Sequence, residues 1–81
     1  MSTVTVQLFA SYAESFGGPT IEVTLQPGST VGDLVKTIRS LPGSGVLPDS
    51  PRVAVNRKFA TPQQLISAID EIALIPPVAG G

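Results

Sequence analysis

Residues 30–43, TVGDLVKTIRSLPG, carry the strongest helix signal in the chain. Thr30 is a good N-cap, and Asp33 stands where a capping box places its acidic residue, with a charge that suits a helix N-terminus. The apolar residues recur at helical spacing: Val31, Leu34, Val35, Ile38 and Leu41. Pro42-Gly43 ends the segment. The stretch therefore predicts an amphipathic helix that packs one apolar stripe against a sheet.

Two alternating segments precede this helix. Residues 3–9 and 21–26 place apolar and polar side chains on opposite faces, which is typical of half-buried strands. Between them, Ser11 can cap a short helical turn over residues 12–16. This half of the chain therefore predicts two strands joined by a helical turn.

Shorter strand patterns follow the helix, after a surface loop at residues 42–51 that is rich in proline, glycine and serine. The predicted strands are residues 52–56, 58–60 and 71–75. Residues 61–65 are predicted to form a helical turn. One long helix after two strands, with three strands to follow, predicts an α+β fold in which the helix covers one face of the sheet.

Composition sets limits on function. The 81 residues suffice for one domain. Cysteine and histidine are both absent, which excludes a disulfide, a thiolate metal site and the commonest general base, so no metal site is expected. Five basic against six acidic residues argue against nucleic-acid binding. Because no apolar run approaches a membrane span and the first residues do not resemble a signal peptide, we expect a cytoplasmic protein.

The C-terminal segment is the strongest functional feature. It is made of rigid or small residues that could enter a narrow pocket of another protein: Pro76, Pro77, Val78, Ala79, Gly80 and Gly81. We therefore divide the chain into a domain of residues 1–75 and an extended tail of residues 76–81. The alternative is a frayed end without function. On the functional interpretation, the working group is the terminal carboxylate of Gly81.

Residues 72–81, IALIPPVAGG, closely resemble the C-terminal signature of molybdopterin synthase small subunits. Residues 8–10, 30–34 and 53–56 resemble that family too, so the resemblance covers essentially the whole chain. It implies a ubiquitin-like β-grasp fold, with a mixed sheet of about five strands and one main helix. In one departure, residues 68–71 read AIDE where the family usually has an Asp-Gly-Asp-Glu-type turn.

The resemblance also implies a reaction cycle. An adenylating enzyme of the ubiquitin-activating type would use ATP to join AMP to Gly81, and a sulfur donor protein would convert the adenylate to a thiocarboxylate. The tail would then enter a pocket of the large synthase subunit, in a heterotetramer of two small and two large subunits, and pass its sulfur to cyclic pyranopterin monophosphate. This chain would bind no cofactor and would have no autonomous activity.

A partner surface is predicted from strand phase. Phe9 and Ile75 fall on the polar faces of the first and last strands, which are adjacent in a β-grasp sheet, and Phe59 could extend the same patch. The alternative places Phe9 and Phe59 under loops as a satellite of the core. Three basic residues lie nearby: Arg52, Arg57 and Lys58. They could steer an acidic partner, although such charges are more often merely solvated.

Three other functions stay open. The chain could carry sulfur for thiamine synthesis or another pathway, although the Pro-Pro-Val-Ala lead-in argues against it. It could be a ubiquitin-like modifier that Gly81 attaches to lysines of other proteins. Finally, it could be an interaction module whose tail is inert.

Overall fold

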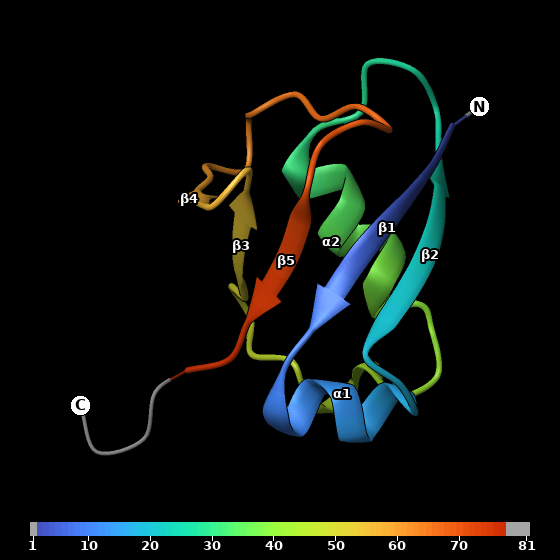
Figure 1. Cartoon of the computed structure of the whole chain (residues 1–81), viewed down its shortest axis with the longest axis vertical. Helices are drawn as coiled ribbons and strands as arrows, with labels where there is room; N and C mark the ends of the chain where they lie inside the picture. Colours follow the sequence, from blue (N-terminus) through green and yellow to red (C-terminus); the bar gives the residue numbers. More distant parts are fainter. Residues whose placement is uncertain (1, 78–81) are drawn as a thin grey trace.

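The computed structural model describes residues 2–77 of the chain. In this part, five strands form one sheet in the order β2-β1-β5-β3-β4 (Figure 1). The strands are β1 (Ser2–Leu8), β2 (Thr20–Leu25), β3 (Arg52–Val55), β4 (Lys58–Phe59) and β5 (Ile72–Ile75). The helices are α1 (Ala10–Phe16), α2 (Val31–Arg39) and the 3-10 helix η1 (Ser44–Val46). β1 and β5 pair in parallel and the other pairs are antiparallel, which confirms the mixed sheet of a β-grasp fold.

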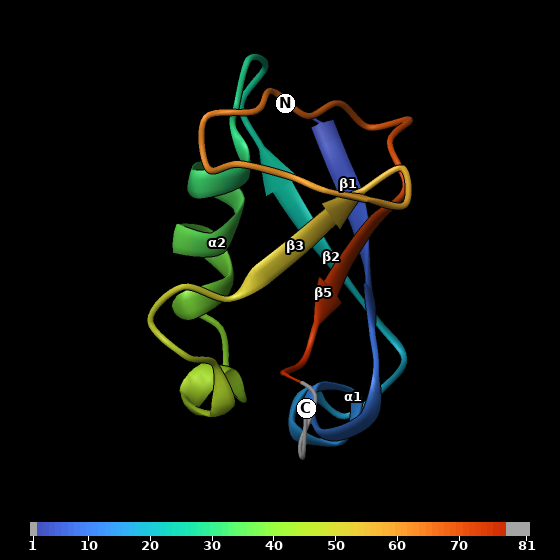
Figure 2. The same cartoon turned by 90° about the vertical axis from the view of Figure 1, so that its left-hand side faces the viewer.

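The helix α2 begins as its capping signal predicts. The backbone N–H of Asp33 donates to Thr30 Oγ1 at 3.2 Å, and the backbone N–H of Thr30 donates to Asp33 Oδ2 at 2.9 Å. Its apolar stripe is buried at Val31, Leu34 and Ile38. Figure 2 shows α2 running along one face of the sheet. The predicted amphipathic helix is therefore confirmed, and it covers this face only.

The core lies between α2 and the sheet. The strand side chains that point into it are buried: Val4, Val6, Leu8, Val23, Leu25, Val53, Val55, Ile72 and Leu74. Burial alternates along β1, β3 and β5, as expected for strands with one covered face. The intervening residues of these strands therefore point to the opposite face, which none of the helices in the described part of the chain covers (Figure 2).

The first helix starts earlier than the sequence predicts. It begins at Ala10 with Phe9 as its N-cap, and no side chain caps it. The helical turn predicted over residues 12–16 is confirmed as part of this helix, but the prediction that Ser11 caps it is wrong. The physical reason is the Phe9 carbonyl, which accepts from the backbone N–H of Tyr12 at 3.0 Å and of Ala13 at 3.4 Å. These bonds close the first turn around the end of β1.

The predicted helical turn at residues 61–65 is also wrong. A turn at Pro62-Gln63 leads instead into a β-bridge between Leu65 and Thr30. The carbonyl of Gln64 accepts from the backbone N–H of Val31 at 2.9 Å, and that of Pro62 accepts from Gly32 at 2.9 Å. This segment thus binds the N–H groups that the first turn of α2 leaves free, a tertiary interaction that outweighs local helix formation.

Candidate functional site

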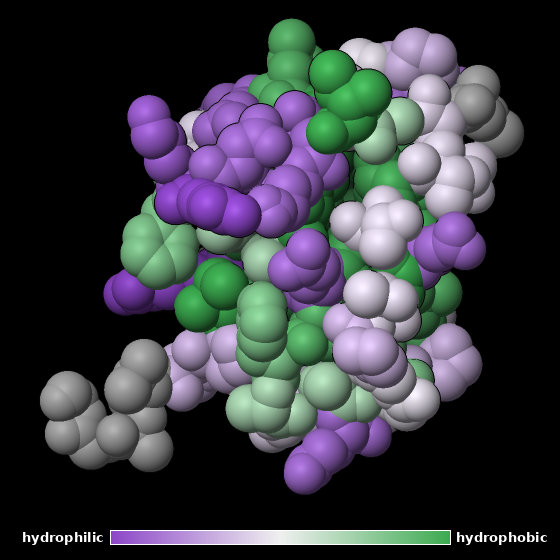
Figure 3. Space-filling view, in the orientation of Figure 1, coloured by the Kyte–Doolittle hydropathy of each residue, from purple (hydrophilic) through white to green (hydrophobic). Residues whose placement is uncertain are grey.

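The uncovered face of the sheet holds a hollow of about 450 Å³, which we call the outer hollow. Its floor and walls are apolar: Phe9, Ala54, Phe59, Ala73 and Ile75. Its rim is polar: Gln7, Arg57 and Glu71. Figure 3 looks onto this face and shows green apolar side chains beside a group of purple hydrophilic ones. The hollow therefore combines an apolar interior with a charged edge.

Strand register explains the shape of the outer hollow. Ala54 lies opposite Ala73 across β3 and β5, and Gln7 is paired with Ala73 across β1 and β5. Two small side chains thus occupy adjacent outward positions at the centre. The larger Phe59, paired with Ala54, rises at one side of them. Small residues flanked by large ones leave a depression on an otherwise flat sheet.

The structure brings together the three residues predicted as a partner surface. Phe9 is 47% exposed, Phe59 is 66% exposed and Ile75 is partly buried, and all three line the outer hollow. Neither phenylalanine is buried as a satellite of the core, which was the alternative. Their role in binding a partner stays a prediction.

The hairpin between β3 and β4 carries backbone strain beside the hollow. Its two central residues both have positive φ, 53° at Asn56 and 71° at Arg57. Two such residues between paired strands form a type I′ turn, for which Asn-Gly is the preferred sequence. Asparagine tolerates this conformation well, whereas a side chain such as that of Arg57 costs about 1–2 kcal/mol there.

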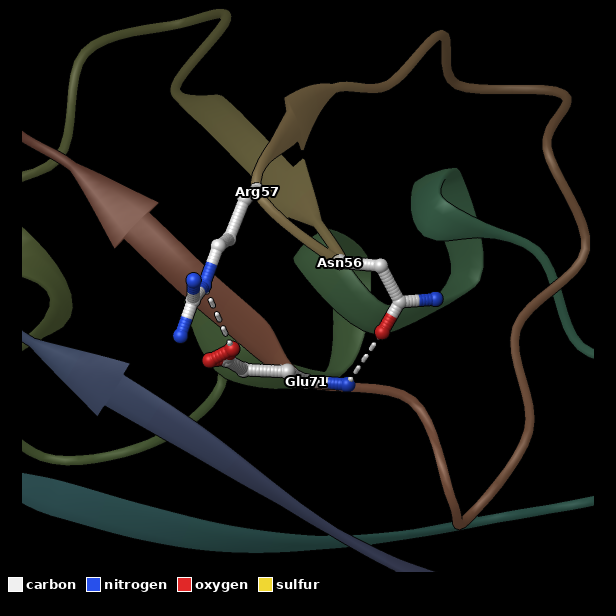
Figure 4. A network of polar contacts seen from close by, with 3 residues as sticks. All are labelled: Asn56, Arg57 and Glu71. Atoms are coloured by element: carbon white, nitrogen blue, oxygen red, sulfur yellow. Dashed lines mark hydrogen bonds and ion pairs between the residues drawn. The ribbon is translucent and has the colours of Figure 1, made fainter.

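A network of polar contacts ties this hairpin to the start of β5 (Figure 4). The backbone N–H of Asn56 donates to the Glu71 carbonyl at 2.7 Å, and the backbone N–H of Glu71 donates to Asn56 Oδ1 at 2.9 Å. Arg57 Nε then lies 3.4 Å from Glu71 Oε1. The backbone bonds fix the turn against the strand, and the ion pair sits on the rim of the hollow.

The turn at residues 68–71 departs from the family pattern without needing a glycine. None of these four residues has a positive φ. The Asp70 carboxylate accepts from the backbone N–H of Ser67 at 2.8 Å and from Asn56 Nδ2 at 3.0 Å. These bonds, first the one from Ser67, hold the pKa of Asp70 below its ordinary value. Asp70 thereby shapes the turn and joins it to the hairpin.

The tail leaves the domain at the end of β5, at the same end of the molecule as α1 (Figure 1). Pro76 is partly buried and Pro77 is exposed. The remaining predicted tail residues lie outside the described part of the chain: Val78, Ala79, Gly80 and Gly81. Their function, and the division of the chain into residues 1–75 and 76–81, stay predictions.

Within residues 2–77, no group of three or more acidic, histidine or cysteine side chains could hold a metal ion. No helix of that range is long and apolar enough to cross a membrane. The candidate site in the described part of the chain is the outer hollow.

Sequence reasoning missed the centre and one edge of this site. Ala54, Ala73 and Gln7 were not singled out, although all three fall on the outward phase of their strands. Glu71 was noted only as part of an acidic turn. The available signal was the alternation of the strands, but it does not say which strands are neighbours.

Comparison with known proteins gives the same fold and a family. A family model described as the ThiS family matches residues 6–81. Small archaeal modifier protein 1 of Haloferax volcanii is 34% identical over an alignment of 84 positions, which spans 93% of this chain and 97% of that protein. Its crystal structure matches with a TM-score of 0.81 and 31% identity, over 99% of this chain and 100% of that one.

One further relative and one solved structure carry names that refer to molybdopterin. The molybdopterin synthase sulfur carrier subunit of Arabidopsis thaliana is 29% identical over 79 residues, 96% of this chain and 82% of that protein. A protein–protein complex of subunits 1 and 2 of the molybdopterin-converting factor from Helicobacter pylori contains a chain with a TM-score of 0.69 and 19% identity. That match covers 98% of this chain and 99% of that one, and at this identity it shows the fold alone.

Proposed function

This chain belongs to the ThiS family of β-grasp sulfur carriers and small modifiers, and from that premise we propose that it is the sulfur-carrying small subunit of a molybdopterin synthase. The observation that carries this choice within the family is the ending PPVAGG at residues 76–81, which resembles the signature of those subunits. The Arabidopsis thaliana relative, matched over 96% of this chain, supports the same choice.

The chemistry takes place on the carboxylate of Gly81. In the adenylating enzyme, a carboxylate oxygen attacks the α-phosphorus of ATP, which releases pyrophosphate and leaves an acyl adenylate. The persulfide of a sulfur donor protein then attacks the acyl carbon and AMP leaves. A second thiol cleaves the resulting acyl disulfide and frees the thiocarboxylate. ATP is thus consumed by the activating enzyme, and this chain needs no cofactor of its own.

The thiocarboxylate then passes its sulfur to cyclic pyranopterin monophosphate in the large subunit. Two such transfers build the dithiolene that later binds molybdenum. The large subunit would supply the remaining catalytic groups, which fits a chain without histidine or cysteine. Pro76 and Pro77 restrict the chain to extended conformations and would hold the reactive end away from the domain.

The outer hollow would be the docking face for the large subunit and for the adenylating enzyme in turn. Its exposed phenylalanines, Phe9 and Phe59, offer apolar area that a partner can cover. Ile75 lines the hollow and is also the last residue of β5, directly before the tail. A partner that holds this face is therefore well placed to receive the tail.

An assay of sulfur transfer to cyclic pyranopterin monophosphate tests whether this chain acts in molybdopterin synthesis. Thiocarboxylated protein would be incubated with its host's large subunit and cyclic pyranopterin monophosphate, and molybdopterin would be measured by its fluorescent oxidation product. We expect product, and none from a chain shortened by Gly81. If this chain gave no product while another thiocarboxylated carrier served the same large subunit, its sulfur would belong to a different pathway, such as thiamine synthesis.

A modifier is the second candidate, favoured by the 34% identity to small archaeal modifier protein 1. In that case the acyl adenylate would be attacked by a lysine amine and not by sulfur, with an isopeptide bond from Gly81 as the product. Mass spectrometry of cell extracts would detect lysines that carry the C-terminal residues of this chain. Such conjugates, dependent on the adenylating enzyme, would support the modifier.

A further inference from the structure

Arg57 occupies a position that the backbone favours for glycine. Its φ of 71° is the second positive value of the type I′ turn, where Asn-Gly is preferred. Its side chain is 89% exposed, so it contributes little packing, and its ion-pair partner Glu71 is itself 40% exposed. Exposed ion pairs add little stability. Backbone strain at Arg57 that no stabilising contact offsets is a reason to look for a function of this residue.

Both members of this ion pair line the outer hollow. The guanidinium of Arg52 does not line the hollow, but it lies 5.4 Å from the centroid of the Phe59 ring, which does. Lys58 is paired with Val55, whose side chain is buried in the core, so Lys58 lies on the other phase of β4 and does not line the hollow. The apolar interior is therefore bordered by the Arg57–Glu71 pair, and the guanidinium of Arg52 against Phe59 adds a second positive charge nearby.

We propose that the partner segment that fills the outer hollow carries a carboxylate next to its apolar side chain, and that Arg57 exchanges Glu71 for this carboxylate on docking. Breaking the Arg57–Glu71 pair costs little in the free protein because water already surrounds it. Beneath a docked partner water is excluded, and a charge-assisted bond there is stronger. This inference rests on the proposed function only in taking the hollow as the docking face.

The exchange predicts effects of opposite sign for the two rim residues. Arg57→Gln removes the group that binds the partner's carboxylate, so affinity should fall about tenfold at low salt and less at high salt. Glu71→Gln removes the competing carboxylate, so affinity should rise by about twofold to fivefold. The backbone bonds between Asn56 and Glu71 do not involve the altered atoms, so the turn should persist.

The experiment is a calorimetric titration of each variant with the adenylating enzyme and with the large synthase subunit of the same host. Lys36→Gln is the matched control, because it removes the same charge from α2, on the other layer of the molecule. Its affinities should stay within about twofold of wild type. If Arg57→Gln behaves like this control with both partners, or if the two rim variants shift in the same direction, the exchange is overturned.

A second variant separates recognition from folding. Arg57→Gly supplies the residue that the turn prefers, so its Tm should rise by about 2–4 °C while its affinity falls as in Arg57→Gln. If Arg57 had a merely structural role, its replacement would lower both Tm and affinity. A fall in Tm, which is measured on the free protein, would therefore already overturn the inference. If the wild-type chain binds neither protein, the docking face and the proposed function fall with it. If the wild-type chain binds but the two rim variants do not show the predicted effects, the exchange is wrong and the proposed function is unaffected.

Discussion

Replacing Gly43 with alanine would drive a Cβ atom into the backbone of α1. The added atom would lie 2.6 Å from the Ser15 carbonyl oxygen, 3.1 Å from its carbon and 3.2 Å from Phe16 Cα. Gly43 also has a φ of 95°, which alanine rarely adopts. The same residue accepts a hydrogen bond from Ser15 Oγ at 2.7 Å, so the two segments cannot separate without losing it.

The cost can be worked from these contacts. The positive φ accounts for about 1–2 kcal/mol, and forcing an atom into packed backbone accounts for about 1–3 kcal/mol. The sum, about 2–5 kcal/mol, is a large part of the roughly 4–12 kcal/mol that a domain of this size has. We therefore expect Gly43→Ala to lower Tm by about 10–25 °C.

Thermal unfolding followed by circular dichroism measures this change. Gly45→Ala is the matched control, since Gly45 lies two residues further on in η1, has nothing within 4 Å of the added Cβ and has no positive φ. Its Tm should stay within about 4 °C of wild type. If Gly43→Ala unfolded at the same temperature as Gly45→Ala, the close packing of this loop on α1 would be refuted.

Phe59→Ser should weaken binding of the adenylating enzyme about tenfold or more, and Tm should not change because Phe59 is 66% exposed. Leu65 is 65% exposed but does not line the outer hollow, so Leu65→Ser should leave the affinity unchanged. Equal losses of affinity in the two variants would argue against the docking face. Tyr12→Phe removes a buried hydroxyl that has no hydrogen-bond partner among residues 2–77, so the free energy of unfolding in urea should rise by about 1 kcal/mol. A comparable fall would show that the hydroxyl is bonded. Backbone hydrogen bonds lower the folded-state pKa of Asp33 and Asp70 below the reference value of 3.8, so the stability they add is complete above that pH and is lost as pH falls through the folded pKa values. The urea concentration at the unfolding midpoint should therefore decrease as the pH is lowered from about 5 to 2. The decrease should be less steep in the Asp33→Asn/Asp70→Asn double variant, and parallel curves for wild type and variant would contradict this prediction.

Most of the correctly predicted elements were found from patterns of residues that are close together in the sequence. The stripe of α2 and its Thr30–Asp33 capping box depend on residues within a few positions of each other, and both are confirmed. The strands were found for the same reason, because alternation is a property of the segment itself. Where the structure differs, a partner distant in the sequence decides: residues 61–65 bind the first turn of α2 instead of forming a turn of helix.

The candidate site was predictable in part. Phe9 and Ile75 could be found because their side chains break the expected polarity of their strands. The floor of the hollow could not, since Ala54 and Ala73 are ordinary residues that matter only when register pairs them. Arg57 was visible as a charge, but its strain appears only in the backbone angles.

The central claim is that Gly81 carries sulfur, and the intact mass of the protein tests it most directly. The chain would be incubated with ATP, the adenylating enzyme of its host and a sulfur donor, and then weighed by mass spectrometry. We expect the gain that replaces one oxygen by one sulfur atom, and no gain when Gly81 is deleted. An unchanged mass, while a known carrier is converted in the same reaction, would contradict the account.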